Sequence, residues 1–130
     1  MNIHTGPVGV YVSQQNMNLA ISMRRELLVE IAIYALSSAL ASFLWRVPYF
    51  LAFCLFLVSV FALYRWHTRS DLLVYSIGFV LGPTAEGVAV YFGAWAYSKP
   101  FFLIPIWLPF LWGIAVLLVK RLADTLTQGV

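Results

Sequence analysis

Four long apolar runs, separated by short polar segments, set the hydrophobic pattern of this chain. They cover about residues 27–45, 47–64, 72–97 and 101–119. At 1.5 Å per residue, a helix over the first run is about 28 Å long, which matches the hydrocarbon core of a bilayer. The pattern therefore predicts an all-α fold, a single integral membrane bundle of about four transmembrane helices formed by residues 1–130.

Residues 1–23 precede the first run and carry no lysine or arginine. The stretch from His4 to Gly9 is broken by Gly6 and Pro7. A secretory signal peptide needs positive charge before its apolar core, and none is present here. We therefore expect a poorly ordered or surface-lying N-terminal tail.

Prolines indicate irregularities in the third and fourth helices. Pro83 follows Gly82 near the middle of the third run, where it removes a backbone donor and clashes with the carbonyl four residues earlier. A kink is therefore expected at Gly82-Pro83. Pro105 and Pro109 both suit a first helical turn, so the fourth helix is expected to begin at either of them.

Positive charge is unevenly divided between the two ends of the predicted helices. Six of the eight lysines and arginines fall on the side of the N-terminus, the connection 65–71 and the C-terminus, and only Arg46 and Lys99 fall on the other. The six are Arg24, Arg25, Arg65, Arg69, Lys120 and Arg121. The positive-inside rule then places both termini in the cytoplasm and predicts a multi-pass protein of the inner or plasma membrane. The connection 65–71 is expected to be exposed to water.

The composition is typical of a membrane protein and indicates which classes of partner to expect. Hydrophobic residues make up 62% of the chain and charged residues 10%, against roughly 25% charged in soluble domains. Membrane lipids are therefore expected to contact the chain. The basic residues form no block that could follow phosphates, so nucleic acid is not an expected partner.

The sequence contains none of the common signatures of cofactor or metal sites. The single cysteine, Cys54, allows no intrachain disulfide. The two histidines lie in the tail and in a connection, with no second His or Cys at metal-binding spacing, and no glycine-rich phosphate loop is present. We expect no cofactor and no bound metal.

Glu86 is the first candidate for a functional residue. It lies in the third apolar run, about 20 Å from the cytoplasmic end of that run, so it is expected near the middle of the membrane. A charged carboxylate there costs about 2.5–3.5 kcal/mol, so it needs a partner or a use. We expect it to contact a proton or a ligand, beneath an aromatic opening formed by Tyr91, Trp95 and Trp107.

Small residues near Glu86 indicate close helix packing. Gly78 and Gly82 are four residues apart, a spacing that lets another backbone approach, and Pro83 and Gly87 lie close by. Glu30 and Tyr34 form a second candidate pair on one stripe of the first helix. Glu30 is expected to reach lipid headgroups or the neighbouring arginines near the cytoplasmic boundary.

The C-terminal half carries a distinctive spacing of glycine, proline and aromatic residues. The stretches are Gly82-Pro83-Thr84-Ala85-Glu86, Phe92-Gly93-Ala94-Trp95-Ala96-Tyr97, and Pro105-Ile106-Trp107-Leu108-Pro109 with Trp112-Gly113. This pattern resembles the C-terminal half of small bacterial inner-membrane proteins of unknown function. The resemblance covers Gly82–Gly113 and implies an architecture without an activity.

Three functions remain open. The leading hypothesis is a non-enzymatic accessory or assembly subunit, present as a homo-oligomer or bound to a larger membrane protein. A small proton-coupled carrier using Glu86 is the second, because the chain is similar in size to small multidrug transporters. Those proteins keep their charge bias small, whereas this chain is biased six to two. The third is a membrane enzyme acting on a lipid or isoprenoid, with Glu86 as general acid.

Overall fold

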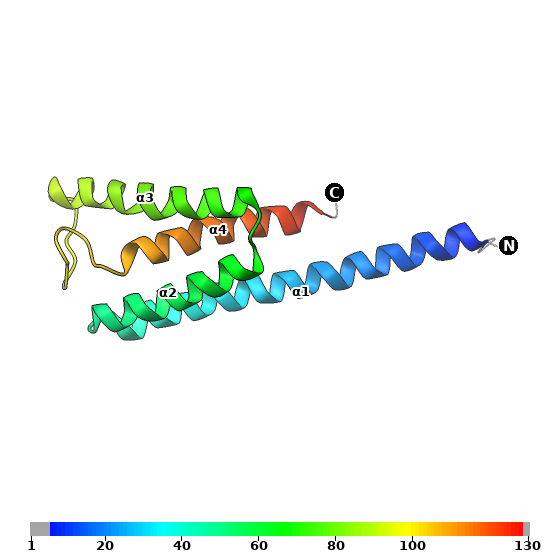
Figure 1. The fold of residues 1–130 in the computed structure, drawn as a ribbon, viewed down its shortest axis with the longest axis horizontal. Helices are drawn as coiled ribbons and strands as arrows, with labels where there is room; N and C mark the ends of the chain where they lie inside the picture. The colour runs from blue at the N-terminus through cyan, green and yellow to red at the C-terminus, as the bar shows by residue number, and fades with distance from the viewer. Residues whose placement is uncertain (1–5, 129–130) are drawn as a thin grey trace.

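The computed structural model describes residues 6–128, which fold into four helices (Figure 1). These are α1 (Pro7–Leu44), α2 (Pro48–Arg65), α3 (Arg69–Tyr91) and α4 (Leu108–Thr127). The described residues contain no strand, so the all-α prediction is confirmed for this part of the chain. By length and composition, α1, α2 and α3 can each cross a membrane.

The first helix is much longer than the first apolar run. It begins at Pro7, so residues 7–23 are helical and not poorly ordered. Whether this segment lies on a membrane surface stays a prediction, and His4 lies outside the described residues. Proline is well placed at the start of a helix, where its missing N–H would have no partner. After Gly9 the helix contains no further glycine or proline, so nothing interrupts it before Leu44. This N-terminal half projects past the other helices (Figure 1).

The third helix ends at Tyr91 instead of at residue 97. Gly93 has a φ of 82°, the left-handed conformation that glycine adopts without strain. The N–H of Ala94 donates to the carbonyl of Ala89 at 2.9 Å, and that of Gly93 to Val90 at 3.0 Å. These two bonds form a Schellman motif, which stops the helix. Residues 92–107 then form a non-helical connection.

The fourth helix begins at Leu108, with Pro109 in its first turn, so residues 101–107 are not helical as the expected span 101–119 required. Pro105 disfavours the helical conformation at Ile104, and α4 begins after it with Pro109 in its first turn. Pro83 lies inside α3, which continues through it as one helix. The kink at Gly82-Pro83 stays a prediction.

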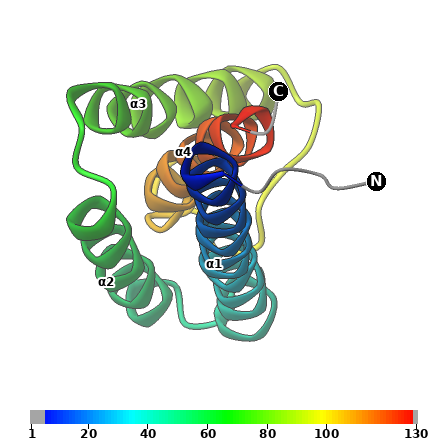
Figure 2. The same cartoon turned by 90° about the vertical axis from the view of Figure 1, so that its right-hand side faces the viewer.

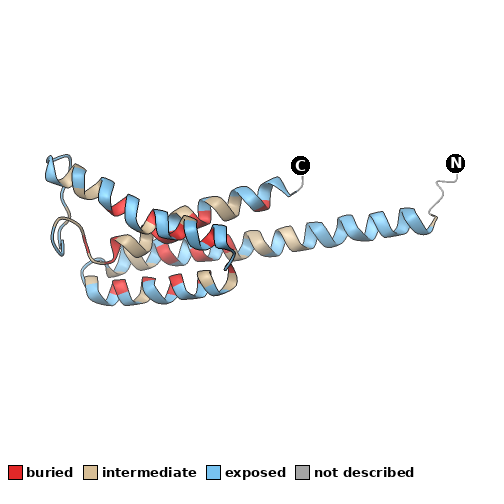
Figure 3. Ribbon diagram, turned by 45° about the horizontal axis from the view of Figure 1, so that its top comes forward, coloured by how far each residue is buried: buried red, intermediate tan, exposed pale blue. Residues whose placement is uncertain are grey.

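The core forms around α4. This helix packs against α1, α2 and α3, and it lies between them when the bundle is viewed end-on (Figure 2). Leu51 and Leu55 of α2 and Ile114 and Leu117 of α4 are almost completely buried. Buried residues gather in this part of the bundle, whereas the projecting half of α1 is exposed along its length (Figure 3).

Candidate functional site

Glu86 lies five residues before the end of α3, about 8 Å from that end along the helix axis. The mid-membrane position expected for it was measured from the cytoplasmic end of the third run, and this depth stays a prediction. Because α3 stops at Tyr91, Glu86 lies in the last part of the helix, beside the non-helical connection 92–107. Its neighbours therefore include loop residues as well as helix residues.

Each carboxylate oxygen of Glu86 accepts a hydrogen bond from a different segment. The hydroxyl of Tyr97, in the connection, donates to Oε2. The indole Nε1 of Trp112, in the second turn of α4, donates to Oε1 at 2.9 Å. Glu86 thus joins α3, the connection and α4, and we call these three residues the carboxylate clamp.

A pocket of about 300 Å³ lies beside the carboxylate clamp. Its walls are mostly apolar and come from the connection and from one side of α4. The lining residues are Glu86, Tyr97, Trp107, Leu108, Leu111, Trp112 and Ala115. The rings of Tyr97 and Trp107 meet edge to face with centroids 6.5 Å apart. The pocket therefore offers an apolar surface with one carboxylate at its side.

The aromatic residues expected around Glu86 are only partly brought together. Trp107 lines the pocket, but Tyr91 is 72% exposed and meets Phe92 edge to face. Trp95 is 49% exposed and is not among the lining residues. Tyr97 takes the place of these two beside the carboxylate.

The glycines of α3 have different surroundings. A Cβ added at Gly82 would lie 2.3 Å from the Trp112 ring, and one added at Gly78 would lie 2.8 Å from the Trp112 carbonyl. Both glycines therefore allow α4 to approach α3, and Pro83 beside them is buried. A Cβ at Gly87 would meet no atom within 4 Å. The face predicted for packing is thus occupied by a helix of the same chain.

Glu30 and Tyr34, the second candidate pair, have different surroundings in the structure. Glu30 is completely buried against α4, where Oε1 accepts a hydrogen bond from the Thr125 hydroxyl at 2.7 Å. Its expected contact with headgroups or with neighbouring arginines is therefore wrong, because its side of α1 is the packed side. Oε2 of Glu30 has no partner among the described residues. Tyr34 is 63% exposed and belongs to no such contact.

A charged cluster at the opposite end of the bundle was not predicted. We define it as Glu26, Arg65, Asp71, Lys120 and Arg121, which come from all four helices. Arg65 bonds Glu26 at 2.6 Å, and Lys120 bonds Asp71 at 2.6 Å. Arg121 lies between the two carboxylates, 3.7 Å from Glu26 and 3.6 Å from Asp71. The cluster therefore ties the four helices together.

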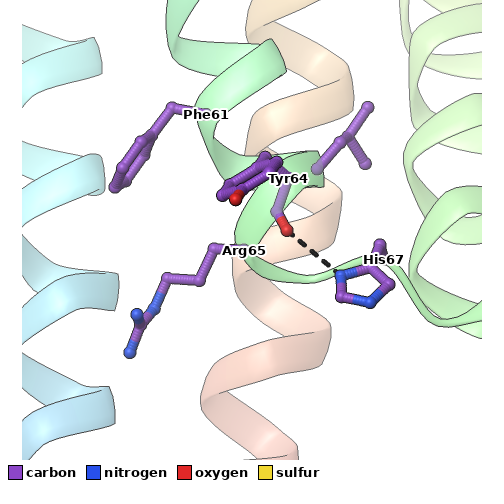
Figure 4. Close-up of a pocket in the computed structure, with 5 residues that line it drawn as sticks. Phe61, Tyr64, Arg65 and His67 are labelled. Carbon is purple, nitrogen blue, oxygen red and sulfur yellow. Dashed lines mark hydrogen bonds between the residues drawn. The ribbon is translucent and has the colours of Figure 1, made fainter.

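The segment 65–71, which contributes Arg65 and Asp71 to this cluster, is less exposed to water than the sequence predicted. Asp71 is fully buried, and its carboxylate forms a capping box with Thr68 at the start of α3. His67 is exposed, with a ring nitrogen 3.1 Å from the Tyr64 carbonyl, beside a hollow of about 670 Å³ (Figure 4). In the same view Arg65 extends away from His67 toward α1. Water exposure of the whole segment 65–71 was therefore the wrong prediction.

Neighbouring carboxylates stabilise the protonated form of Lys120. Asp71, which accepts a hydrogen bond from Lys120, raises the pKa of that lysine, and Asp124 acts in the same direction. Lys120 therefore remains protonated at neutral pH. The described residues include no group of three or more His, Cys, Asp or Glu side chains placed to hold a metal ion.

Fold and site together define a helical bundle with three candidate membrane spans, a carboxylate clamp at one end and a charged cluster at the other. Comparisons with protein-family models, with curated proteins and with solved structures gave no match.

Proposed function

We propose that this chain is a protein of an inner or plasma membrane that crosses the bilayer four times and keeps both termini in the cytoplasm. The distribution of lysine and arginine supports this orientation. The apolar part of α4, residues 108–119, is about 18 Å long and would need the non-helical residues 101–107 to complete a crossing. Non-helical backbone is tolerated at membrane depth where protein surrounds it. Pro105 and Trp107 of that segment are buried, whereas Phe101 and Phe102 at its start are exposed.

Within that membrane, the role we propose is a non-enzymatic one, as an accessory or assembly subunit of a larger complex. The observation that carries this proposal is the projecting half of α1. Residues 7–21 are exposed along their whole length, and residues 7–23 contain no charged side chain. Val8, Tyr11 and Ile21 are among the large apolar side chains on this surface.

A helix with this surface is not stable by itself in water. Isolated helices of about 12–15 residues are marginal even with favourable sequences, and most helical stability in proteins comes from packing. An uncharged surface with many exposed apolar side chains, such as this one, is typical of a protein or membrane contact site, and we propose a protein contact. The partner is therefore expected to cover residues 7–21 with an apolar, weakly charged surface of its own.

The carboxylate clamp supports a structural role for Glu86 over proton transport. A proton-coupled carrier needs a carboxylate that exchanges its proton with both sides of the membrane. Here Tyr97 and Trp112 each donate to one oxygen of Glu86, so both oxygens are already bonded to side chains of the same chain. The clamp instead holds the connection 92–107 against α3 and α4.

One observation favours a second candidate, a membrane enzyme that acts on a lipid or isoprenoid. Such an enzyme needs a second proton-handling group near Glu86, and the Tyr97 hydroxyl supplies one. The adjoining pocket of about 300 Å³ is mostly apolar, as a lipid-derived substrate would require. This candidate predicts that Tyr97→Phe abolishes a chemical activity, which the subunit proposal does not.

Co-purification from native membranes tests the subunit proposal. The tagged full chain is extracted in a gentle detergent, and its partners are identified and quantified by mass spectrometry. We expect a stoichiometric partner, either a second copy or a different membrane protein. The double variant Val12→Asp with Leu19→Asp places two charges on the exposed helix and should lose this partner.

A matched control places the same charges at polar positions. Gln14→Asp with Asn18→Asp adds two carboxylates to the same helix without removing an apolar side chain, so it should retain the partner. A wild-type chain that is recovered as a monomer without any stoichiometric partner contradicts the proposal.

A further inference from the structure

A basic basin opens beside the charged cluster, on the side of α1, α2 and α4. It has a volume of about 490 Å³ and is lined by Arg25, Glu26, Arg65, Trp66 and Arg121. We call these five residues the arginine basin. Three arginines face one carboxylate in it, so its charge is positive. A site of this kind favours an anion.

Several hydrogen-bond donors of the arginines in the basin have no acceptor within the described residues. Glu26 accepts one close bond from Arg65 at 2.6 Å, but Arg121 is 3.7 Å from Glu26 and 3.6 Å from Asp71, too far for a hydrogen bond. The Nε atoms of Arg65 and Arg121 are buried and have no hydrogen-bond partner among the described residues. An oxygen-rich anion in the basin would supply acceptors for the terminal guanidinium nitrogens of Arg121, which form no hydrogen bond with Glu26 or Asp71.

The basin is held in shape before any ligand binds. Trp66 is buried, and its indole Nε1 donates to Glu26 at 3.2 Å. The guanidinium of Arg121 lies over the Trp66 ring, 5.2 Å from its centroid. Cation–π contact and ion pairing therefore fix the position of Arg121 from two sides. Fixed arginines bind a phosphate with less loss of side-chain entropy than mobile ones.

The arginine basin lies at the level where the apolar runs stop. Arg25 precedes the first run, Arg65 ends α2, and Arg121 follows Val119 at the end of the last run. This is the depth of phospholipid headgroups, and basic pockets between transmembrane helices bind such headgroups. We propose that the arginine basin binds an anionic phosphate group, carried by a membrane phospholipid or free in solution. The inference requires only the membrane crossing from the proposed function, not the protein partner.

Native mass spectrometry of the purified full chain tests this site. The chain is exposed to phosphatidylglycerol and, separately, to phosphatidylcholine with the same acyl chains. We expect preferential retention of phosphatidylglycerol by the wild type. Arg25→Gln should weaken that retention about fivefold, since it removes a guanidinium that lines the basin and one hydrogen bond is worth about 1 kcal/mol.

Arg24→Gln is the matched control, because it removes the same charge one position away and Arg24 does not line the basin. It should leave retention within twofold of the wild type. Arg25 is exposed, so its replacement does not endanger folding. Arg121→Gln should also weaken retention, but it removes contacts to two carboxylates, so thermal unfolding of that variant is measured in parallel.

A second arm distinguishes the two sources of phosphate. Inorganic phosphate is titrated onto the lipid-free chain in neutral detergent while the unfolding temperature is followed. Stabilisation of the wild type but not of Arg25→Gln assigns the site to a soluble phosphate, whereas preferential lipid retention alone assigns it to a headgroup. The proposal is overturned if neither probe distinguishes Arg25→Gln from Arg24→Gln.

Discussion

At the scale of single residues, Glu86 connects three parts of the chain because its two oxygens accept bonds from different segments. Tyr97 reaches it from the connection and Trp112 from α4. Removing one donor leaves a half-buried oxygen without a partner, which typically costs about 1–3 kcal/mol. The strength of the clamp can therefore be measured one bond at a time.

Replacing Tyr97 by phenylalanine tests the first of these bonds. Tyr97→Phe should lower the free energy of unfolding by about 1–3 kcal/mol, because only the donating hydroxyl is removed. Tyr91→Phe removes a hydroxyl from an exposed ring and should change stability by less than about 0.5 kcal/mol. Unfolding of both variants in the same detergent gives the comparison. Equal effects would show that the Tyr97 bond contributes nothing.

Replacing Glu86 itself tests the whole clamp. Glu86→Gln keeps an acceptor oxygen for the Trp112 indole and offers an amide N–H to the Tyr97 hydroxyl, which can accept, so it should keep most of the hydrogen bonding in neutral, weaker form. Glu86→Leu leaves both the Tyr97 hydroxyl and the Trp112 indole without an acceptor. Thermal unfolding should therefore rank the wild type above Gln and Gln above Leu. A Leu variant as stable as the wild type would place the functional centre elsewhere.

The sequence singles out Glu86 more readily than its partners. A carboxylate inside an apolar run stands out by itself, since its charge is costly there. Tyr97 and Trp112 are 11 and 26 residues away, and their positions depend on where α3 ends. Gly93 was the available signal for that end, because glycine just after an apolar run favours a left-handed stop. Without that boundary, the sequence analysis placed Tyr97 at the end of the third helix.

At the scale of helices, α3 and α4 approach closely through glycine. The Trp112 ring lies where a side chain at position 82 would be, and the same ring bonds Glu86. Packing and clamp are therefore coupled at Trp112. The spacing of Gly78 and Gly82 predicted a close approach without indicating whether the neighbour was in the same chain.

A pair of glycine substitutions tests the close packing of α3 against α4. Gly82→Ala places a methyl group 2.3 Å from the Trp112 ring and should destabilise the chain by about 1–3 kcal/mol. Gly87→Ala has open space and should stabilise α3 by about 0.5–1 kcal/mol, because alanine is the better helix former. Chemical denaturation of both variants measures the two effects. Destabilisation by Gly87→Ala equal to that by Gly82→Ala would contradict this packing.

Helix boundaries were harder to predict than helix existence. All four apolar runs contain a helix, because their length and composition dominate the local signals. The start of α1 was missed because residues 7–23 are polar and apolar without a clear period, although Pro7 is a good first residue. The start of α4 depended on a choice between two prolines that the sequence left open.

At the scale of the whole molecule, charge lies at one end and the aromatic connection at the other. The charged cluster joins four helices whose basic residues were predicted only as orientation signals. Its pairing could not be predicted, because Glu26, Asp71 and Arg121 meet only after the bundle has formed. Glu30 was likewise assigned to the membrane surface, although it is packed against α4.

The number of crossings is the central claim about the whole molecule. If α4 crosses the membrane, the C-terminus returns to the side of the N-terminus. If only α1, α2 and α3 cross, the C-terminus stays on the side of the connection 92–107. The position of one residue near the end of α4 therefore decides between four crossings and three.

Cysteine labelling in intact cells tests this claim most directly. On a Cys54→Ala background, single cysteines are introduced as Ser98→Cys and Thr127→Cys and treated with a membrane-impermeant maleimide. Four crossings with cytoplasmic termini predict that position 98 is labelled in intact cells, and that position 127 is labelled only after permeabilisation. Labelling of position 127 together with position 98 in intact cells would contradict the account and leave α4 on the outer side.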